Sequence, residues 1–170
     1  MSDTKQYLTF KLENEVFAVD VANIREILDY IPATKVPGTP DFMRGVINVR
    51  GSVIPVMDMR LKFGLPRGVE TVNTCIVVLE VTMDNEKTVL GALADSVQEV
   101  FEMEDSSIEP PPKLGTRWKR EFLKGIGKRN ESLVIILDIN KVFTTEEIAM
   151  IQEGLPQDTA TEAKAAEAAI

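Results

Sequence analysis

The chain has 170 residues, of which 44% are hydrophobic, and it carries a formal net charge of −8. It has no histidine and one cysteine, which excludes a histidine general base, a self-phosphorylated histidine, an internal disulfide and a multi-cysteine metal site. The acidic balance argues against a general nucleic-acid binder, and no apolar stretch approaches the ~20 residues that span a bilayer. Because the N-terminus lacks signal-peptide features, we expect a cytoplasmic protein that does not insert into the membrane.

Short apolar segments of strand type occupy the first half of the chain. The predicted strands are residues 7–12, 16–19, 46–49 and 53–57. Between the second and third of these, Val21, Ile24 and Leu28 have helical spacing and predict one short turn of helix. The last two strands flank Arg50-Gly51-Ser52, which is a hairpin signal.

The second half begins with the same kind of pattern and ends in the main helix. Its predicted strands are residues 74–81, 89–92 and 133–137. Thr144-Thr145-Glu146-Glu147 is a capping box, so we expect a late helix over residues 145–153. Residues 157–170 are rich in Ala and Glu and are expected to form a flexible tail.

The two halves resemble each other along most of their length. The matched segments are 16–28 with 89–101 and 42–46 with 122–126, together with Asp58 and Asp138, and Phe63 and Phe143. Two copies of one topology are the simplest explanation. Many short strands with frequent turns favour small barrels. We therefore predict one domain, residues 1–156, with two barrel subdomains: residues 16–64 with the strand 7–12, and residues 74–143.

Several features that could carry chemistry have simpler interpretations. Cys75 lies in an apolar run and is expected to be a small buried hydrophobe rather than a reactive thiol. Gly125-Ile126-Gly127-Lys128 lacks the residues that a phosphate loop requires. Asp58 and Asp138 occupy one repeated position after a strand, which favours a turn or cap role over a catalytic pair. The stretch Arg117–Arg120 around Trp118 is expected to cover a barrel end or to contact an acidic protein rather than to bind nucleic acid. No cofactor, metal site or enzymatic activity is expected.

Glu26 and Arg50 are the charged residues that stand out. Glu26 lies between the apolar residues Ile24 and Ile27 at the mouth of the first predicted barrel, and Arg50 lies in the hairpin turn. In the repeat, Glu26 is retained as Glu99, whereas Arg50 is replaced by Asn130. A structural salt bridge and an oriented charge at a protein-binding groove both fit these observations, and the two interpretations are compatible.

The segment 42–60, Phe-Met-Arg-Gly-Val-Ile-Asn-Val-Arg-Gly-Ser-Val-Ile-Pro-Val-Met-Asp-Met-Arg, resembles the CheW family of chemotaxis coupling proteins. The similarity extends over roughly residues 6–152, with Val49 where the family more often has Leu. It implies two SH3-like five-stranded β-barrels packed together. It also implies a stand-alone, non-catalytic adaptor that couples bacterial chemoreceptors to the histidine kinase CheA. A peptide-binding barrel module outside chemotaxis and a small hydrolase using Asp58 or Asp138 are the alternatives.

The resemblance further implies partners and site residues. A receptor helical hairpin would bind in the groove between the barrels, and the C-terminal regulatory domain of CheA would bind barrel end to barrel end. The residues expected in the receptor groove or its support are Ile24, Glu26, Ile27, Gly45, Asn48 and Arg50. Leu114 is expected near the kinase or another ring subunit. The chain would be a monomer in isolation and would associate with the inner face of the membrane only through receptor arrays.

Overall fold

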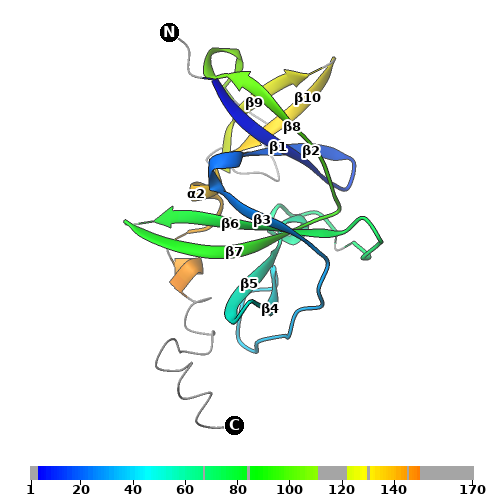
Figure 1. The fold of residues 1–170 in the computed structure, drawn as a ribbon, viewed down its shortest axis with the longest axis vertical. Helices are drawn as coiled ribbons and strands as arrows, with labels where there is room; N and C mark the ends of the chain where they lie inside the picture. The colour runs from blue at the N-terminus through cyan, green and yellow to red at the C-terminus, as the bar shows by residue number, and fades with distance from the viewer. Residues whose placement is uncertain are drawn as a thin grey trace.

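The computed structural model describes residues 4–66, 68–83, 85–110, 122–129, 131–144 and 146–149. Within these residues the fold is mostly β, with ten strands in two five-stranded sheets (Figure 1). The strands are β1 (Thr4–Leu12), β2 (Glu15–Asp20), β3 (Ile24–Asp29), β4 (Met43–Val49), β5 (Ser52–Asp58), β6 (Cys75–Met83), β7 (Glu86–Ala94), β8 (Ser96–Glu104), β9 (Leu123–Arg129) and β10 (Ser132–Leu137). The helical elements are η1 (Val21–Asn23), α1 (Met59–Lys62), η2 (Asp105–Ser107) and α2 (Ile139–Val142).

Each sheet forms one of the two small SH3-like barrels, which confirms the predicted fold class. Barrel 1 has the strand order β8-β1-β2-β10-β9, and barrel 2 has the order β3-β6-β7-β5-β4. Each barrel therefore combines strands from both halves of the chain. The predicted subdomain boundaries, 16–64 with 7–12 and 74–143, do not coincide with the barrels. The chain leaves barrel 1 after β2 and returns to it at β8, an exchange that strand patterning cannot reveal because it reports faces and not pairing partners.

The internal repeat is present in the structure at matching positions. Asp58 and Asp138, 80 positions apart, are the N-caps of α1 and α2, and their backbone N–H groups donate to the carbonyls of Phe42 and Phe122. The chain thus uses the same local geometry twice. The cap role predicted for the two aspartates is confirmed, because both side chains accept backbone hydrogen bonds at the start of a helix.

Apolar side chains form a core between the barrels and a smaller core inside each barrel. Along β6, Val77 and Leu79 belong to the core between the barrels, whereas Ile76 and Val78 belong to the core inside barrel 2. This alternation is expected because successive side chains of a strand point to opposite faces. β6 is therefore covered on both faces over residues 76–79, which explains why this part of its sequence is apolar without interruption.

The structure describes parts of both segments that are predicted to be helical. The capping box is confirmed: Thr144 N donates to Glu147 Oε1 at 2.9 Å, and Glu147 N donates to Thr144 Oγ1 at 3.0 Å. Residues 146–149 are helical, and the rest of the predicted helix 145–153 and the tail 157–170 lie outside the described residues. The predicted turn after the second strand is η1, but Ile24–Leu28 is strand. Among the described residues, no helix is long and apolar enough to cross a membrane.

Candidate functional site

An apolar surface lies where the edge strands β3 and β8 meet the boundary between the barrels. Residues directly opposite each other on paired strands place their side chains on the same face. Ile24 lies opposite Leu79 and Ile27 lies opposite Val77, and both partners belong to the core between the barrels. The two isoleucines of β3 therefore face the boundary between the barrels.

Strand β8 contributes a matching pair from barrel 1. Val97 lies opposite Phe10 and Val100 lies opposite Leu8, and both partners again belong to the core between the barrels. The two valines thus face the same boundary from the other side. In the internal repeat, Val97 and Val100 are the positions that match the isoleucines of β3.

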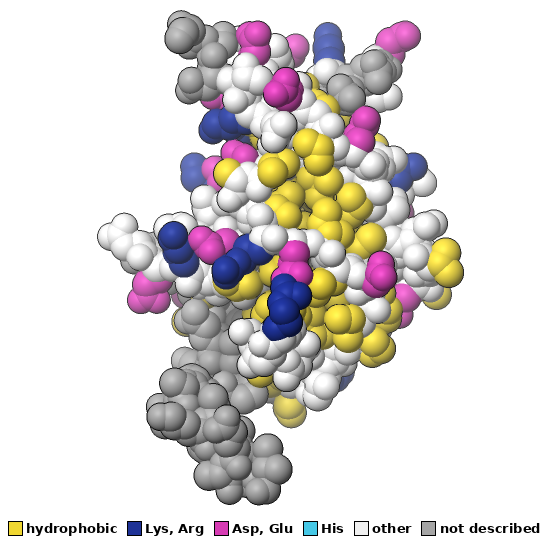
Figure 2. Space-filling model, viewed as in Figure 1, with side chains coloured by type: hydrophobic (Ala, Val, Ile, Leu, Met, Phe, Trp, Pro, Cys, Tyr) yellow, Lys and Arg dark blue, Asp and Glu magenta, His cyan; other side chains and the backbone are white. Residues whose placement is uncertain are grey.

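We call Ile24, Ile27, Val97 and Val100 the apolar strip. Ile24 and Val97 are half-buried against the core, whereas Ile27 and Val100 are 45% and 52% exposed. Both edge strands cross the side of the molecule that Figure 1 presents, and hydrophobic side chains gather there across both barrels (Figure 2). Large apolar side chains exposed together on a surface are typical of a protein-binding site.

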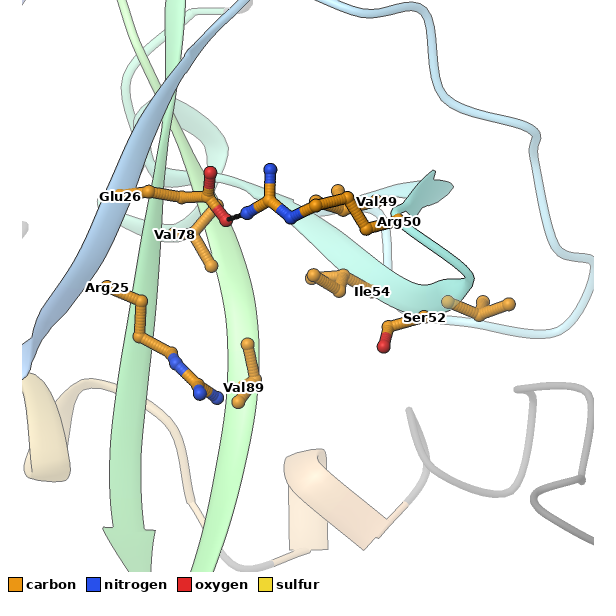
Figure 3. A pocket seen from close by; sticks show the side chains of 9 residues that line it. Arg25, Glu26, Val49, Arg50, Ser52, Ile54, Val78 and Val89 are labelled. Carbon is orange, nitrogen blue, oxygen red and sulfur yellow. Dashed lines mark hydrogen bonds and ion pairs between the residues drawn. The ribbon is translucent and has the colours of Figure 1, made fainter.

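A pocket of about 500 Å³ lies beside the strip, at the end of barrel 2 (Figure 3). Its apolar wall includes Val49, Ile54 and Val78. Across its mouth, Arg50 Nη2 donates a hydrogen bond to Glu26 Oε2. Strand β3 therefore serves both surfaces, with Ile27 turned toward the strip and Glu26 toward the pocket. Glu26 belongs to barrel 2, and not to a barrel built from the first half as the sequence had suggested.

The β4–β5 turn determines where Arg50 lies. Val49 pairs with Ser52, so Arg50 and Gly51 form a two-residue turn, with φ of +50° and +88°. Positive φ at both positions is the requirement of a type I′ hairpin turn. Asn48 Oδ1 accepts a hydrogen bond from Gly51 N at 2.9 Å. Asn48 thus supports the turn and leaves the Arg50 side chain, 71% exposed, free to reach β3.

The ion pair changes the titration of Glu26. The hydrogen bond from Arg50 is the main cause that lowers the pKa of the Glu26 carboxyl, and the charges of Arg50 and Arg25 act in the same direction. Burial opposes them. The carboxylate therefore keeps its negative charge to lower pH than an unpaired glutamate, and the pair is ionised at neutral pH.

The structure brings together only part of the predicted residue set. Ile24 and Ile27 lie in the strip, whereas Glu26, Asn48 and Arg50 lie at the neighbouring barrel end. Gly45 instead has a packing role. A Cβ atom there would lie 2.3 Å from the carbonyl oxygen of Thr34, and φ is +141°, so no other residue fits without displacing the backbone. Leu114 lies outside the described residues.

Sequence reasoning missed Val97 and Val100. The signal was available, since both match strip residues in the internal repeat, but a match between halves does not show that the two segments lie on one surface. That requires β3 and β8 to be edge strands of different barrels facing the same boundary.

The other candidate sites behave as structural features. The glycines at 125 and 127 lie within strand β9, and Gly125 packs against the Glu109 carbonyl, so this segment is no phosphate loop. Burial is the main cause that raises the pKa of the Cys75 thiol, which disfavours the reactive thiolate. No cluster of potential metal ligands occurs among the described residues. Trp118 lies outside them.

Comparison with known proteins agrees with this architecture. Residues 6–147 match the family model of the CheW-like domain. The chain is 33% identical to the chemotaxis protein CheW of Klebsiella aerogenes over 147 residues, 86% of each chain. It is 31% identical to that of Thermotoga maritima over 150 residues, 88% of this chain and 93% of the relative.

Among solved structures, the chain is similar to the scaffolding protein TtCheW from Thermoanaerobacter tengcongensis. The TM-score is 0.74 at 31% identity, and the match covers 85% of this chain and 91% of that one. The chain therefore belongs to the CheW family and is a non-catalytic adaptor of chemotaxis signalling.

Proposed function

We propose that the chain couples chemoreceptors to the histidine kinase CheA by binding a receptor helix along the apolar strip and the kinase at a barrel end. The observation that supports it best is the strip itself, in which each barrel exposes one large apolar side chain at the same boundary. Membership of the CheW family supports the same role. Coupling of this kind depends on the geometry of binding and needs no chemical step.

The receptor partner is an amphipathic helix of the cytoplasmic hairpin tip. Such a helix presents apolar side chains at i, i+3, i+4 and i+7, which suits a narrow line of apolar residues with polar borders. Ile27 and Val100 are the exposed members of the strip and would make the central contacts. Binding to a receptor would hold the protein at the inner face of the membrane.

The Glu26–Arg50 pair would form a polar border next to this contact. Arg50 is well exposed and is held over β3 by its partner, so its charge has a defined position from which to orient a helix that carries acidic side chains. Asn48 contributes indirectly, because it stabilises the turn that presents Arg50.

The kinase contact is proposed at the barrel ends. Val53 and Leu133, 80 positions apart, are 42% and 61% exposed at the starts of β5 and β10. Equivalent apolar residues at both barrel ends suit a partner built from the same kind of barrel, because such a partner offers a surface of matching shape. The expected role of Leu114 in this contact stays a prediction.

The strip is tested with Ile27→Glu and Val100→Glu, and Val72→Glu is the matched control. Val72 is 99% exposed and lies in the segment before β6, so a new charge there costs little. We expect each strip variant to weaken binding of a purified receptor hairpin at least tenfold, because a buried glutamate must lose its water. The control should bind like the wild type. Wild-type affinity in both strip variants would contradict the proposal.

The polar border is tested with Arg50→Glu in a reconstituted mixture of receptor, adaptor and kinase. The new carboxylate would face Glu26 and repel it, while the backbone of the turn can stay as it is. We expect kinase activation to fall about tenfold with an unchanged far-UV circular dichroism spectrum. Normal kinase activation with this variant would contradict the placement of Arg50 at the receptor contact.

A further inference from the structure

A single residue connects the last strand of barrel 2 to the strand of barrel 1 that carries half of the strip. β7 ends at Ala94 and β8 begins at Ser96, so Asp95 alone makes the crossing. Val97 follows two residues later. The position of Asp95 therefore decides where the β8 side of the strip begins relative to the β3 side.

Arg60 holds this crossing. Its Nη1 donates to Asp95 Oδ2 at 2.6 Å, and its Nη2 lies 3.5 Å from Glu13 Oε2 in the β1–β2 turn of barrel 1. Arg60 itself is anchored to barrel 2, because α1 follows β5 directly and Asp58 caps it. Glu13 N donates to the same Asp95 Oδ2 at 2.7 Å, so the guanidinium ties barrel 2 to one cluster at the β1–β2 turn of barrel 1.

The surroundings restrict the Arg60 side chain to this position. Its Nε donates to the Pro66 carbonyl at 2.8 Å, and a Cβ on Gly68 would lie 2.7 Å from Nη1, so the backbone covers the guanidinium. Only 15% of the side chain is exposed. A planar group with several fixed donors held this way is better suited to setting a geometry than a flexible surface pair.

The internal repeat has no arginine at the equivalent position. The matching residue in α2, 80 positions on, is Asn140, whose Oδ1 accepts one hydrogen bond from Thr82 N at 2.8 Å. A neutral hydrogen bond occupies that position. The ionic contact of Arg60 with Asp95, which we call the clasp, occurs instead at the crossing that leads into the strip.

We propose that Arg60 is a positioning residue, which sets the separation between the β3 and β8 sides of the apolar strip by pinning Asp95 to barrel 2. The expected effect on receptor binding rests on the proposed function, whereas the expected effect on the spacing of β3 and β8 does not depend on any partner. Without Arg60, Asp95 stays bonded to barrel 1, because its N–H donates to the Lys11 carbonyl at 2.9 Å and its Oδ2 accepts from Glu13 N at 2.7 Å. What is lost is the side-chain contact of Asp95 with barrel 2, so the two sides of the strip no longer hold one spacing.

Arg44 provides the matched control. Its side chain is 12% exposed and it pairs with two carboxylates, Asp58 at 3.1 Å and Glu70 at 2.9 Å. Both partners lie in the segment from β5 to β6, so this pair does not reach barrel 1. Arg44→Met and Arg60→Met therefore remove similarly buried charges, each paired with two carboxylates, and they differ in whether those ion pairs join the barrels.

The geometry is measured as a spin-label distance between cysteines introduced at the exposed positions Asp29 of β3 and Glu102 of β8, in a Cys75→Ser background. We expect Arg60→Met to broaden the distance distribution and Arg44→Met to leave it as in the wild type. In the same variants without labels, Arg60→Met should weaken receptor-hairpin binding about tenfold, and Arg44→Met less than twofold. Arg60→Lys, which keeps the charge, should restore part of the affinity.

A distance distribution of wild-type width in Arg60→Met would overturn the proposal, as would equal losses of hairpin affinity in the two Met variants. If Arg60→Met fails to fold, the spin-label distance and the hairpin affinity are measured in Asp95→Asn and Arg60→Lys instead. Failure of the wild-type protein to bind any hairpin would contradict the proposed function, while broadening in Arg60→Met would still support the clasp. Combining Arg60→Met with Asp95→Asn should cost less than the sum of the two single losses, because both changes break the Arg60–Asp95 contact.

Discussion

At the scale of single residues, an ion pair joins Glu26 and Arg50 in the candidate site. The two residues are 24 positions apart in the chain. Glu26 lies in β3 and Arg50 in the turn that follows β4, and these two strands lie at opposite edges of one sheet. The pair therefore closes the end of barrel 2 from edge to edge. Because both side chains remain partly exposed, we assign the pair an orienting role and attach no stability to it.

Removal of Arg50 should change the titration of Glu26 in a defined direction. The pKa of Glu26 is lowered in the folded protein, so the ion pair is formed at neutral pH and is lost as the pH falls through that lowered pKa. We expect Arg50→Gln to raise the pKa of Glu26 toward its ordinary value, measured by NMR titration of the side-chain carboxyl.

Arg25→Gln is the control for this titration. The Arg25 charge makes the smallest contribution to the lowered pKa, and its nearest partner is Glu80 at 3.7 Å. It should therefore raise the pKa of Glu26 less than Arg50→Gln does. Equal shifts in the two variants would show that general positive charge, and not the hydrogen bond, sets the titration.

At the scale of elements, the C-terminal helix is held by more than its capping box. Both carboxylate oxygens of Glu147 lie 2.8 Å from Lys62 Nζ. That ammonium group also lies over three aromatic rings, 4.9 to 5.6 Å from the centroids of Phe42, Phe122 and Phe143. Only 8% of the Lys62 side chain is exposed. One glutamate thus completes a helix cap and neutralises a buried cation.

The two roles of Glu147 predict unequal costs for two changes within one capping box. Thr144→Ala should lower the free energy of unfolding by about 1 kcal/mol, the usual cost of a lost cap. Glu147→Ala should cost about 3 kcal/mol, because it also leaves Lys62 buried without its partner. Chemical denaturation measures both values.

Lys62→Met separates the cost of the unpaired Lys62 charge from the cost of the lost helix cap. In the Glu147→Ala background it removes the unpaired charge and should recover part of the lost stability, since methionine is apolar and of similar length. A further loss in the double variant would instead mean that the contacts of the cation with the aromatic rings outweigh its need for a carboxylate.

The elements also show where sequence patterns mislead. Val21, Ile24 and Leu28 are spaced as on a helix, yet β3 begins at Ile24. The pairing register of β3 with β6 shifts between Ile24 and Glu26, so Arg25 is an extra residue in the strand. The bulge places Ile24 and Ile27 on one face, while Leu28 packs against the core inside barrel 2, so the helical spacing does not mark a shared face. The capping box, in contrast, is predicted correctly from the sequence, because its hydrogen bonds join residues only three positions apart.

At the scale of the whole molecule, the exchange of strands makes each half of the chain dependent on the other. Residues 1–70 contain β1 and β2 of barrel 1 together with β3, β4 and β5 of barrel 2, and neither sheet is complete without the second half. We expect residues 1–70 and 71–170, produced separately, to give no folded monomer, as judged by NMR amide dispersion. Mixing them should restore the native spectrum.

Independent folding of either half as a monomer would contradict this picture. It would mean that the strands of one repeat can pair with each other, as the predicted subdomain boundaries imply. A full-length chain with a cleavable linker between β5 and β6 is the control, because cutting it after folding should leave both barrels intact.

The sequence by itself determined the β class, the duplication, the two aspartate caps, the capping box and the resemblance to the CheW family. All of these depend on residues that are close in the chain or that recur at a constant interval. It also pointed to Ile24, Ile27 and Arg50, but it could not say that the first two share a surface with Val97 and Val100.

Only the tertiary structure decided which barrel each strand joins, and with it the apolar strip and the contact of Arg60 with Asp95. Alternation in a sequence shows which side chains share a face of a strand, but it carries no information on the neighbour with which that strand pairs. The strip and the clasp arise from pairings between strands far apart in the chain. They exist only because the chain crosses between the barrels after β2 and again at Asp95.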